Sequence, residues 1–96
     1  MDQPGIRPGA LVRSLAGRDR GSSYVVLRPA DEWRVAVSDG RRRPLDRPKR
    51  KNRRHLEVLG WVDATLASRL ERGDRVSDQE IEKILSALAP RLVEEV

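Results

Sequence analysis

A short charged stretch, GRDRG, places Gly17 and Gly21 on either side of two arginines and an aspartate. The glycines allow the backbone to turn tightly and to approach a ligand closely. Asp19 can accept hydrogen bonds from the loop backbone and so hold the shape of the loop. Arg18 and Arg20 would then point outward, where a guanidinium can form a forked pair of hydrogen bonds with a phosphate. From these residues alone, an ordinary charged turn and an anion-binding loop are both possible.

A second candidate for binding an anion is the run RRRPLDRPKRKNRR at residues 41–54, which holds nine basic residues and one acidic residue. Its net charge is therefore +8. A bound polyanion would relieve the mutual repulsion and release counterions. Arginine outnumbers lysine seven to two, which favours planar, bidentate contacts with phosphates and bases. The plain alternative is a solvated, disordered segment or a basic targeting patch.

Residues suited to catalysis or metal binding are scarce. His55 is the only histidine and there is no cysteine. The chain therefore has few residues that could form a metal site or a nucleophile with its general base. Asp31 and Glu32 are adjacent, and on a strand they would face opposite sides. We therefore expect no enzyme activity, no metal and no cofactor.

The elements that would position these residues begin with short strands separated by turns. Five strands are predicted, at residues 10–15, 23–29, 33–40, 41–46 and 55–60. Pro44 would confine the fourth strand to an edge of the sheet. Trp33, Val35 and Val37 occupy alternate positions of one predicted strand and so share one face of it, which predicts that the Trp33 side chain lies in the core. Short strands with tight turns favour a small β-barrel.

From residue 61 the hydrophobic pattern becomes helical. Asp63 can cap a helix over 64–72, and Gly73 can end it. Ser77 and Glu80 form a capping box for a second helix. The apolar stripe of that helix consists of Ile81, Ile84, Leu85 and Leu88.

The helical segment is also expected to contact the rest of the chain. Pro90 should end or kink the second helix. Trp61 is expected to pack the helical hairpin onto the barrel. The apolar stripe buries either against the first helix and the barrel, or in the groove of a partner protein.

The charge is divided unevenly along the chain. Residues 1–56 hold 15 basic and 6 acidic residues, a net of +9, whereas residues 57–96 hold 5 and 9, a net of −4. We expect a basic β-barrel over residues 1–60 and an acidic helical hairpin over 61–96. The N-terminus has no apolar core of a signal peptide, and no apolar run approaches about 18 residues, so neither secretion nor a membrane span is expected. With no cysteine present, a cytoplasmic location is expected.

Over roughly residues 8–59, the stretches VRSLAGRDRGSSYVVL and WRVAVSDGRRRPLDRPKRKNRRHL resemble the KOW family. More narrowly, they resemble bacterial KOW-domain RNA-binding proteins related to certain archaeal and eukaryotic large-subunit ribosomal proteins. The resemblance implies a five-stranded barrel like that of Src-homology-3 (SH3) domains, whose KOW loop touches ribosomal RNA. Here that loop is the GRDRG segment.

Together these patterns predict a mainly β fold with α-helices, an SH3-like barrel followed by a helical hairpin. The expected function is non-catalytic RNA binding, with ribosomal RNA on or near the large subunit as the partner. The alternative is a KOW adaptor of the transcription or translation machinery that recruits a protein through residues 61–96. Charge alone would also allow a nonspecific DNA binder. The expected RNA-binding residues are Arg13, Arg18, Arg20, Tyr24, Arg41, Arg42, Arg43, Arg47, Lys49, Arg50, Lys51, Arg53 and Arg54, with Gly17, Asp19 and Gly21 shaping the loop.

Overall fold

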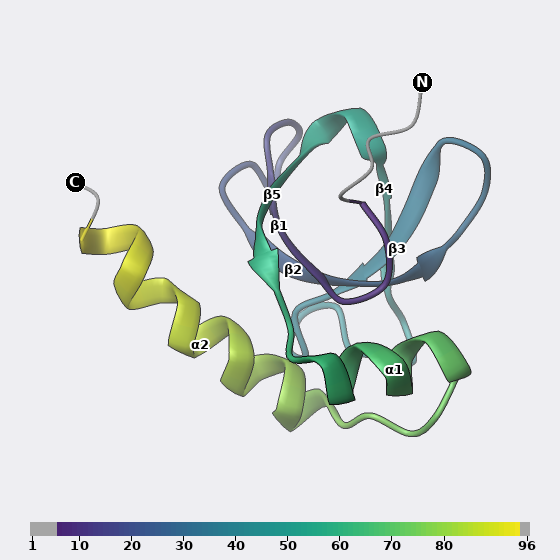
Figure 1. Ribbon diagram of the computed structural model, residues 1–96. Coiled ribbons are helices and arrows are strands. Elements are labelled where there is room, and N and C mark those ends of the chain that lie inside the picture. Colours follow the sequence, from purple (N-terminus) through teal and green to yellow (C-terminus); the bar gives the residue numbers. More distant parts are fainter. Residues whose placement is uncertain (1–5, 95–96) are drawn as a thin grey trace.

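The structure, a computed structural model, describes the backbone of residues 6–94 and the side chains of residues 6–88. This part of the chain forms a five-stranded sheet followed by two helices (Figure 1). The strands are β1 (Ala10–Ser14), β2 (Ser23–Pro29), β3 (Arg34–Ser38), β4 (Lys49–Asn52) and β5 (Leu56–Trp61). The helices are α1 (Ala64–Arg72) and α2 (Asp78–Glu94), and a single 3₁₀ turn, η1 (Arg53–His55), joins β4 to β5. The fold is mainly β with α, as predicted.

All neighbouring strands are antiparallel, and their order in the sheet is β4-β3-β2-β1-β5. The sheet curls strongly, so that η1 spans from one edge strand to the other (Figure 1). No backbone ladder between β4 and β5 closes the sheet in the described chain. The structure therefore confirms a small antiparallel β-sheet with two helices, but not a closed barrel.

Two apolar clusters lie on the two faces of this sheet, because successive side chains of a strand point to opposite sides. On β1, Val12 belongs to the cluster inside the curl and Leu11 to the cluster outside it. The inner cluster consists of Ile6, Ala10, Val12, Tyr24, Val26, Val35, Val37 and Leu56. The buried members of the outer cluster are Leu11, Val25, Val62, Leu66 and Ile81. The helices thus cover the outer face of the sheet. The apolar stripe of α2 packs there through Ile81, its first residue.

The helix ends follow the local sequence signals. The Asp63 carboxylate accepts a hydrogen bond from the Leu66 N–H at 2.8 Å, and Gly73 ends α1 with a φ of 75°. The Glu80 N–H donates to Ser77 Oγ at 3.1 Å, and the Ser77 N–H donates to the Glu80 carboxylate at 2.9 Å. The predicted caps and the capping box are confirmed.

The prediction of a fourth strand at residues 41–46 is wrong, because these residues belong to a loop and β4 begins only at Lys49. The Asp39 carboxylate accepts hydrogen bonds from the N–H groups of Arg41 and Arg43, each at 2.9 Å. A side chain that takes these donors holds the backbone in a turn and keeps it from pairing as a strand. Pro44, which has no N–H, adds to the same effect.

Both tryptophans lie elsewhere than predicted. Trp33 is 58% exposed, because β3 begins at Arg34 and the turn before it directs the indole outward. Trp61 is 46% exposed, and the Arg7 guanidinium lies 5.3 Å from its ring centroid. Val62 joins the helices to the sheet instead, at 8% exposure.

Pro90 was expected to end or kink the second helix, and it does not end it, since α2 continues to Glu94. A proline removes only one helical hydrogen bond and one helical carbonyl must adjust to its ring, so a helix can run on beyond it.

Candidate nucleic-acid interface

The loop between β1 and β2, residues 15–22, is closed at its base by two backbone hydrogen bonds. The Ser14 N–H donates to the Ser22 carbonyl and the Gly21 N–H donates to the Ser14 carbonyl, each at 2.8 Å. Gly17 and Gly21 have φ angles of 86° and 92°, a left-handed region in which other residues are strained. Both glycines therefore occupy the tight turns of this loop.

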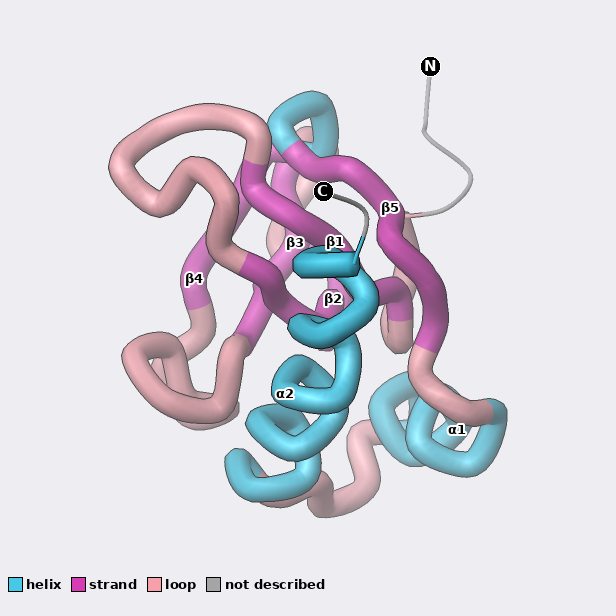
Figure 2. Tube along the Cα trace, turned by 90° about the vertical axis from the view of Figure 1, so that its left-hand side faces the viewer, coloured by secondary structure: helices cyan, strands magenta, loops and turns pink. Residues whose placement is uncertain are grey.

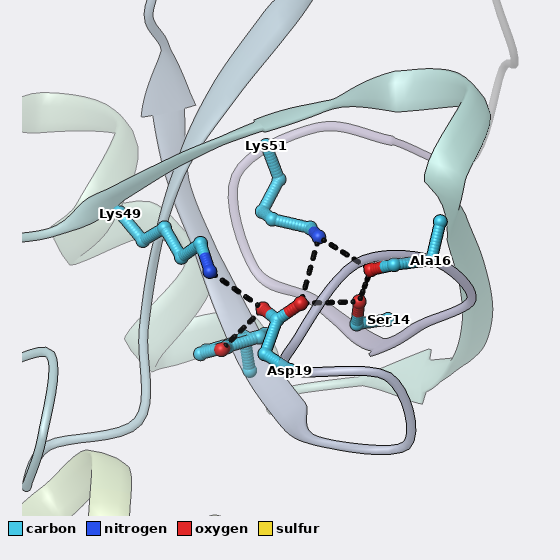
Figure 3. Close-up of polar contacts among 6 residues, drawn as sticks. Ser14, Ala16, Asp19, Lys49 and Lys51 are labelled. Carbon is cyan, nitrogen blue, oxygen red and sulfur yellow. Dashed lines mark hydrogen bonds and ion pairs between the residues drawn. The ribbon is translucent and has the colours of Figure 1, made fainter.

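The Asp19 carboxylate is the centre of a side-chain network at the mouth of the curled sheet (Figure 3). Its Oδ1 lies 2.9 Å from Ser14 Oγ and 3.0 Å from Lys51 Nζ. Its Oδ2 accepts from the Tyr24 hydroxyl at 2.6 Å and lies 3.1 Å from Lys49 Nζ. We call these five residues the Asp19 network. Asp19 does hold the loop, but it does so through side chains of β1, β2 and β4 and not through loop N–H groups.

The network keeps its carboxylate charged and its phenol neutral. Burial raises the pKa of Asp19, but the hydrogen bonds from Tyr24, Lys51, Ser14 and Lys49 outweigh it and hold that pKa well below its usual range. Burial and the neighbouring Asp19 carboxylate raise the pKa of Tyr24 far above its usual value. The loop therefore rests on a fixed negative charge that two ammonium groups neutralise.

Successive side chains of β4 point to opposite faces of the strand, which divides the basic residues of this strand into two sets. Lys49 and Lys51 share one face of the strand and reach Asp19, whereas Arg50 between them is exposed. Lys51 is only 7% exposed and also donates to the Ala16 carbonyl at 3.2 Å. Lys51, one of the expected RNA-binding residues, therefore uses its charge inside the protein.

Tyr24 is buried too, at 3% exposure, within the inner apolar cluster. Its hydroxyl is committed to Asp19, and its ring has no exposed face on which a base could stack. Tyr24, one of the expected RNA-binding residues, therefore lies inside the protein.

The loop between β3 and β4, residues 39–48, carries the first half of the basic run. Ser38 Oγ donates to the Arg43 carbonyl at 2.7 Å and accepts from the Gly40 N–H at 3.1 Å. Together with the two bonds to the Asp39 carboxylate, these contacts give the arginine backbone a defined path. Arg41, whose side chain leaves this loop, is highly exposed.

This β3–β4 loop is docked on the first turns of α2. The Leu45 N–H donates to Asp78 Oδ1 at 2.7 Å, and Arg41 forms an ion pair with Glu82 at 3.0 Å. Gly40 has a φ of 75°, and a Cβ built on it would lie 2.4 Å from the Asp78 carbonyl oxygen. Only glycine allows the loop to approach the helix so closely, so the acidic start of α2 positions a basic loop.

Side chains from the two loops meet around a shallow depression of about 310 Å³. Figure 2 shows the two loops on the same side of the molecule, above and below one another. The residues that line the depression are Arg18, Asp19, Ser22, Tyr24, Asp39, Arg42, Arg43 and Lys49. A second hollow of about 350 Å³ shares Ser22, Asp39 and Arg42 with the first and adds Ser23 and Arg41. We call the pair the two-loop depression.

The free charge of the two-loop depression is positive. Within the described chain, no carboxylate lies within ion-pair distance of Arg18, Arg42 or Arg43. Asp19 is already neutralised by lysines, and Asp39 accepts backbone donors. An anion entering the depression would meet three exposed guanidinium groups from two different loops.

The other predicted contact residues are not gathered here. Arg13 lies on β1 opposite Glu57 and donates to its carboxylate from Nε at 3.0 Å. Arg53 donates from a guanidinium N–H to the Ile6 carbonyl at 3.4 Å. The remaining four, which are exposed and do not line the two-loop depression, are Arg20, Arg47, Arg50 and Arg54.

Sequence reasoning missed two residues that organise the interface. Ser14 is 1% exposed and bonds to Asp19, and Asp39 orders the arginine loop. The dipeptide DG at 39–40 did signal a turn, but nothing in the pattern tied Ser14 to a residue five positions later.

No group of three histidines, aspartates or glutamates among the described residues could hold a metal ion. None of the helices in residues 6–94 has the length and apolar character needed to cross a bilayer.

Comparison with models of known protein families gives no match, and comparison with curated protein sequences gives no significant one.

Proposed function

We propose that this chain binds RNA without catalysing a reaction, and that its target is ribosomal RNA on or near the large subunit. The observation that carries the proposal is the meeting of Arg18 with Arg42 and Arg43 around one depression. Guanidinium groups bind phosphate in a bidentate manner. An RNA duplex presents its phosphates and 2′-hydroxyls as a regular surface that a protein reads by shape.

We further propose that the curled sheet is an SH3-like barrel of the KOW type. Two features support this assignment. The edge strands β4 and β5 are joined by the single turn η1, which brings the two edges round toward each other (Figure 1). The GRDRG segment forms the loop between the first two strands, where the resemblance to the KOW family places its RNA-binding loop.

The test is a salt titration of binding to an RNA duplex, for the parent chain and for a variant with Arg18→Ala, Arg42→Ala and Arg43→Ala. If about five phosphates are neutralised, the parent slope of log K against log salt is about −4. Removal of three phosphate contacts should make the slope shallower by roughly 2 to 3. The matched control replaces Arg28, Arg75 and Lys83 by alanine, which removes the same charge from exposed positions outside the two-loop depression.

A control variant that loses as much slope as the loop variant would show that only net charge matters, and would refute the two-loop site. A parent slope near zero would refute electrostatic RNA binding altogether. For the ribosomal target, the chain should cosediment with large subunits and be released by nuclease. Cosedimentation that survives nuclease would point to a protein partner instead.

A second candidate function is that of an adaptor that recruits a protein through its helices. The observation in favour is the partial exposure of Ile84, Leu85 and Leu88, in contrast to the full burial of Ile81 on the same helix. Figure 1 shows α2 running away from the sheet beyond its first turns. A partner retained by the full chain after nuclease, and lost on Leu85→Asp, would support this function.

A further inference from the structure

Trp33 is the most exposed large apolar side chain of the described residues, at 58%. It lies in the turn between β2 and β3, where it takes no part in either apolar cluster. Within residues 6–88, the cation found over an aromatic ring is Arg7 above Trp61, so no guanidinium covers the Trp33 ring. The indole is therefore open to a ligand.

The backbone around this indole is firmly held. Asp31 Oδ1 accepts hydrogen bonds from the N–H groups of Trp33 and Arg34, each at 2.9 Å. The Trp33 carbonyl accepts from the Arg53 N–H at 2.9 Å. An aromatic side chain on a preorganised backbone loses little conformational entropy when it binds.

Cationic residues flank the same indole. The hydrogen bond between Arg53 and Trp33 places the indole residue beside η1. Arg54, the next residue of η1, is exposed. Arg34 pairs with Asp31 at 2.7 Å and so offsets that carboxylate, which leaves the exposed Glu32 set against the two cations Arg53 and Arg54. The surroundings therefore favour a ligand that is aromatic and anionic at once, as a nucleotide is.

The 3₁₀ turn η1 also connects this indole with the loop of residues 15–22. At one end of η1 the Arg53 N–H reaches Trp33, and at the other the His55 carbonyl accepts from the Leu15 N–H at 2.8 Å. Figure 1 shows the β1–β2 loop, η1 and the β2–β3 turn along the same upper edge of the molecule. Arg54, the middle residue of η1, therefore lies along the chain between the contact to Trp33 and the contact to the loop.

We infer that Trp33 is a stacking site for an unpaired base of the bound RNA, with Arg54 as the contact for the adjoining phosphate. This inference rests on the proposed RNA binding and adds to it a preference for RNA with a single-stranded extension. Base stacking on an aromatic side chain tolerates any base, because every base has a π-face. The site thus favours the junction between a duplex, held by the two loops, and a single strand.

The experiment uses the Trp61→Phe variant of the full chain, in which Trp33 is the only tryptophan. It is titrated with a labelled RNA hairpin that carries a single-stranded tail, and with the same hairpin cut blunt. Fluorescence anisotropy of the label reports binding, and Trp33 emission reports stacking. We expect both hairpins to bind, but only the tailed hairpin to quench Trp33 and protect it from acrylamide.

Affinity gives a second, independent measurement. Trp33→Ala should weaken binding of the tailed hairpin by about tenfold and leave the blunt hairpin unaffected. Trp33→Phe should retain most of the affinity, since it keeps an aromatic face. Because Trp33 is exposed, neither change should alter the circular dichroism spectrum.

Two results would overturn the inference while leaving RNA binding in place. The tailed hairpin could bind without any change in Trp33 emission, or Trp33→Ala could weaken both hairpins equally. If anisotropy shows no binding of either hairpin to the parent chain, the proposed function itself fails.

Discussion

At the scale of single residues, Asp19 determines how much of the basic character of the chain reaches the surface. Its carboxylate engages Lys49 and Lys51, which would otherwise carry unpaired charge at the mouth of the sheet. The desolvation of a buried ammonium is costly unless a partner with good geometry compensates it. The charge that remains for a ligand comes from arginines on the two loops.

Asp19→Asn should lower the free energy of unfolding by about 3 kcal/mol at pH 7, because it leaves the buried Lys51 without a counter-charge. Urea unfolding measures this loss. The matched control is Asp46→Asn in the exposed part of the β3–β4 loop, which should change stability by less than about 0.5 kcal/mol. Equal effects of the two variants would contradict the role given to the network.

The same carboxylate predicts how stability depends on pH. The folded pKa of Asp19 lies below that of the unfolded chain, which is about 3.9. Its stabilisation is therefore complete above about pH 5 and is lost as the pH falls below about 4, where the unfolded state binds more protons. At pH 3 the difference between parent and Asp19→Asn should shrink by about 1 kcal/mol. A difference that stays constant from pH 7 to pH 3 would show that Asp19 is not the titrating group.

At the scale of elements, the contact between the β3–β4 loop and α2 links the basic and acidic halves of the chain. Asp78 both belongs to the first turn of α2 and accepts the Leu45 N–H. Gly40 lies against the backbone of that turn. The helix that carries no predicted RNA contact thus positions the loop that carries several.

Gly40→Ala should destabilise the protein more than Gly73→Ala, although both glycines have a φ of 75°. At Gly73 a Cβ meets nothing within 4 Å, so that variant carries only the strain of the left-handed backbone. At Gly40 the new atom collides with the Asp78 backbone, which should add about 1–3 kcal/mol. Thermal or urea unfolding compares the two.

Gly40→Ala should also weaken RNA binding, because the displaced loop no longer holds Arg42 and Arg43 beside Arg18. Gly73→Ala should bind RNA like the parent. If both variants lose the same stability and bind RNA equally, the loop does not depend on its contact with α2.

At the scale of the whole molecule, the sheet and the helices share one apolar cluster. Ile81 of α2 is fully buried in it, together with Leu11 of β1 and Val25 of β2. The outer face of the sheet would be exposed to water without the helices. We therefore expect the chain to unfold as one cooperative unit and not as a barrel with a separate hairpin.

Ile81→Ala should lower stability by about 2–5 kcal/mol and should do so for the sheet and the helices together. Circular dichroism at 222 nm follows the helices, whereas tryptophan emission follows the sheet, since Trp33 and Trp61 lie outside α1 and α2. Ile84→Ala, the same change at a half-buried position of the same helix, should cost clearly less. Helical signal that melts first, while tryptophan emission stays native, would contradict a shared core.

Features that depend on residues close along the chain could be predicted from the amino-acid sequence. The capping box of Ser77 and Glu80, the end of α1 at Gly73 and the turn geometry at Gly17 and Gly21 all follow from local backbone hydrogen bonding. The order of strands and helices was likewise predictable from hydrophobic period, apart from the fourth strand. So was the placement of Arg18 and Arg20 at the tip of an exposed loop.

Which basic residues are free and which are used internally depends on contacts between distant parts of the chain. Lys51 meets Asp19 across 32 positions of sequence, and Leu45 meets Asp78 across 33. Trp33 leaves the core because β3 starts one residue after it, and Tyr24 enters it because its hydroxyl has Asp19 as a partner. The basic run looks uniform in the sequence. In the fold, side chains of β4 point alternately to its two faces, and those on one face form ion pairs with the buried Asp19 carboxylate. Both effects depend on how the sheet curls.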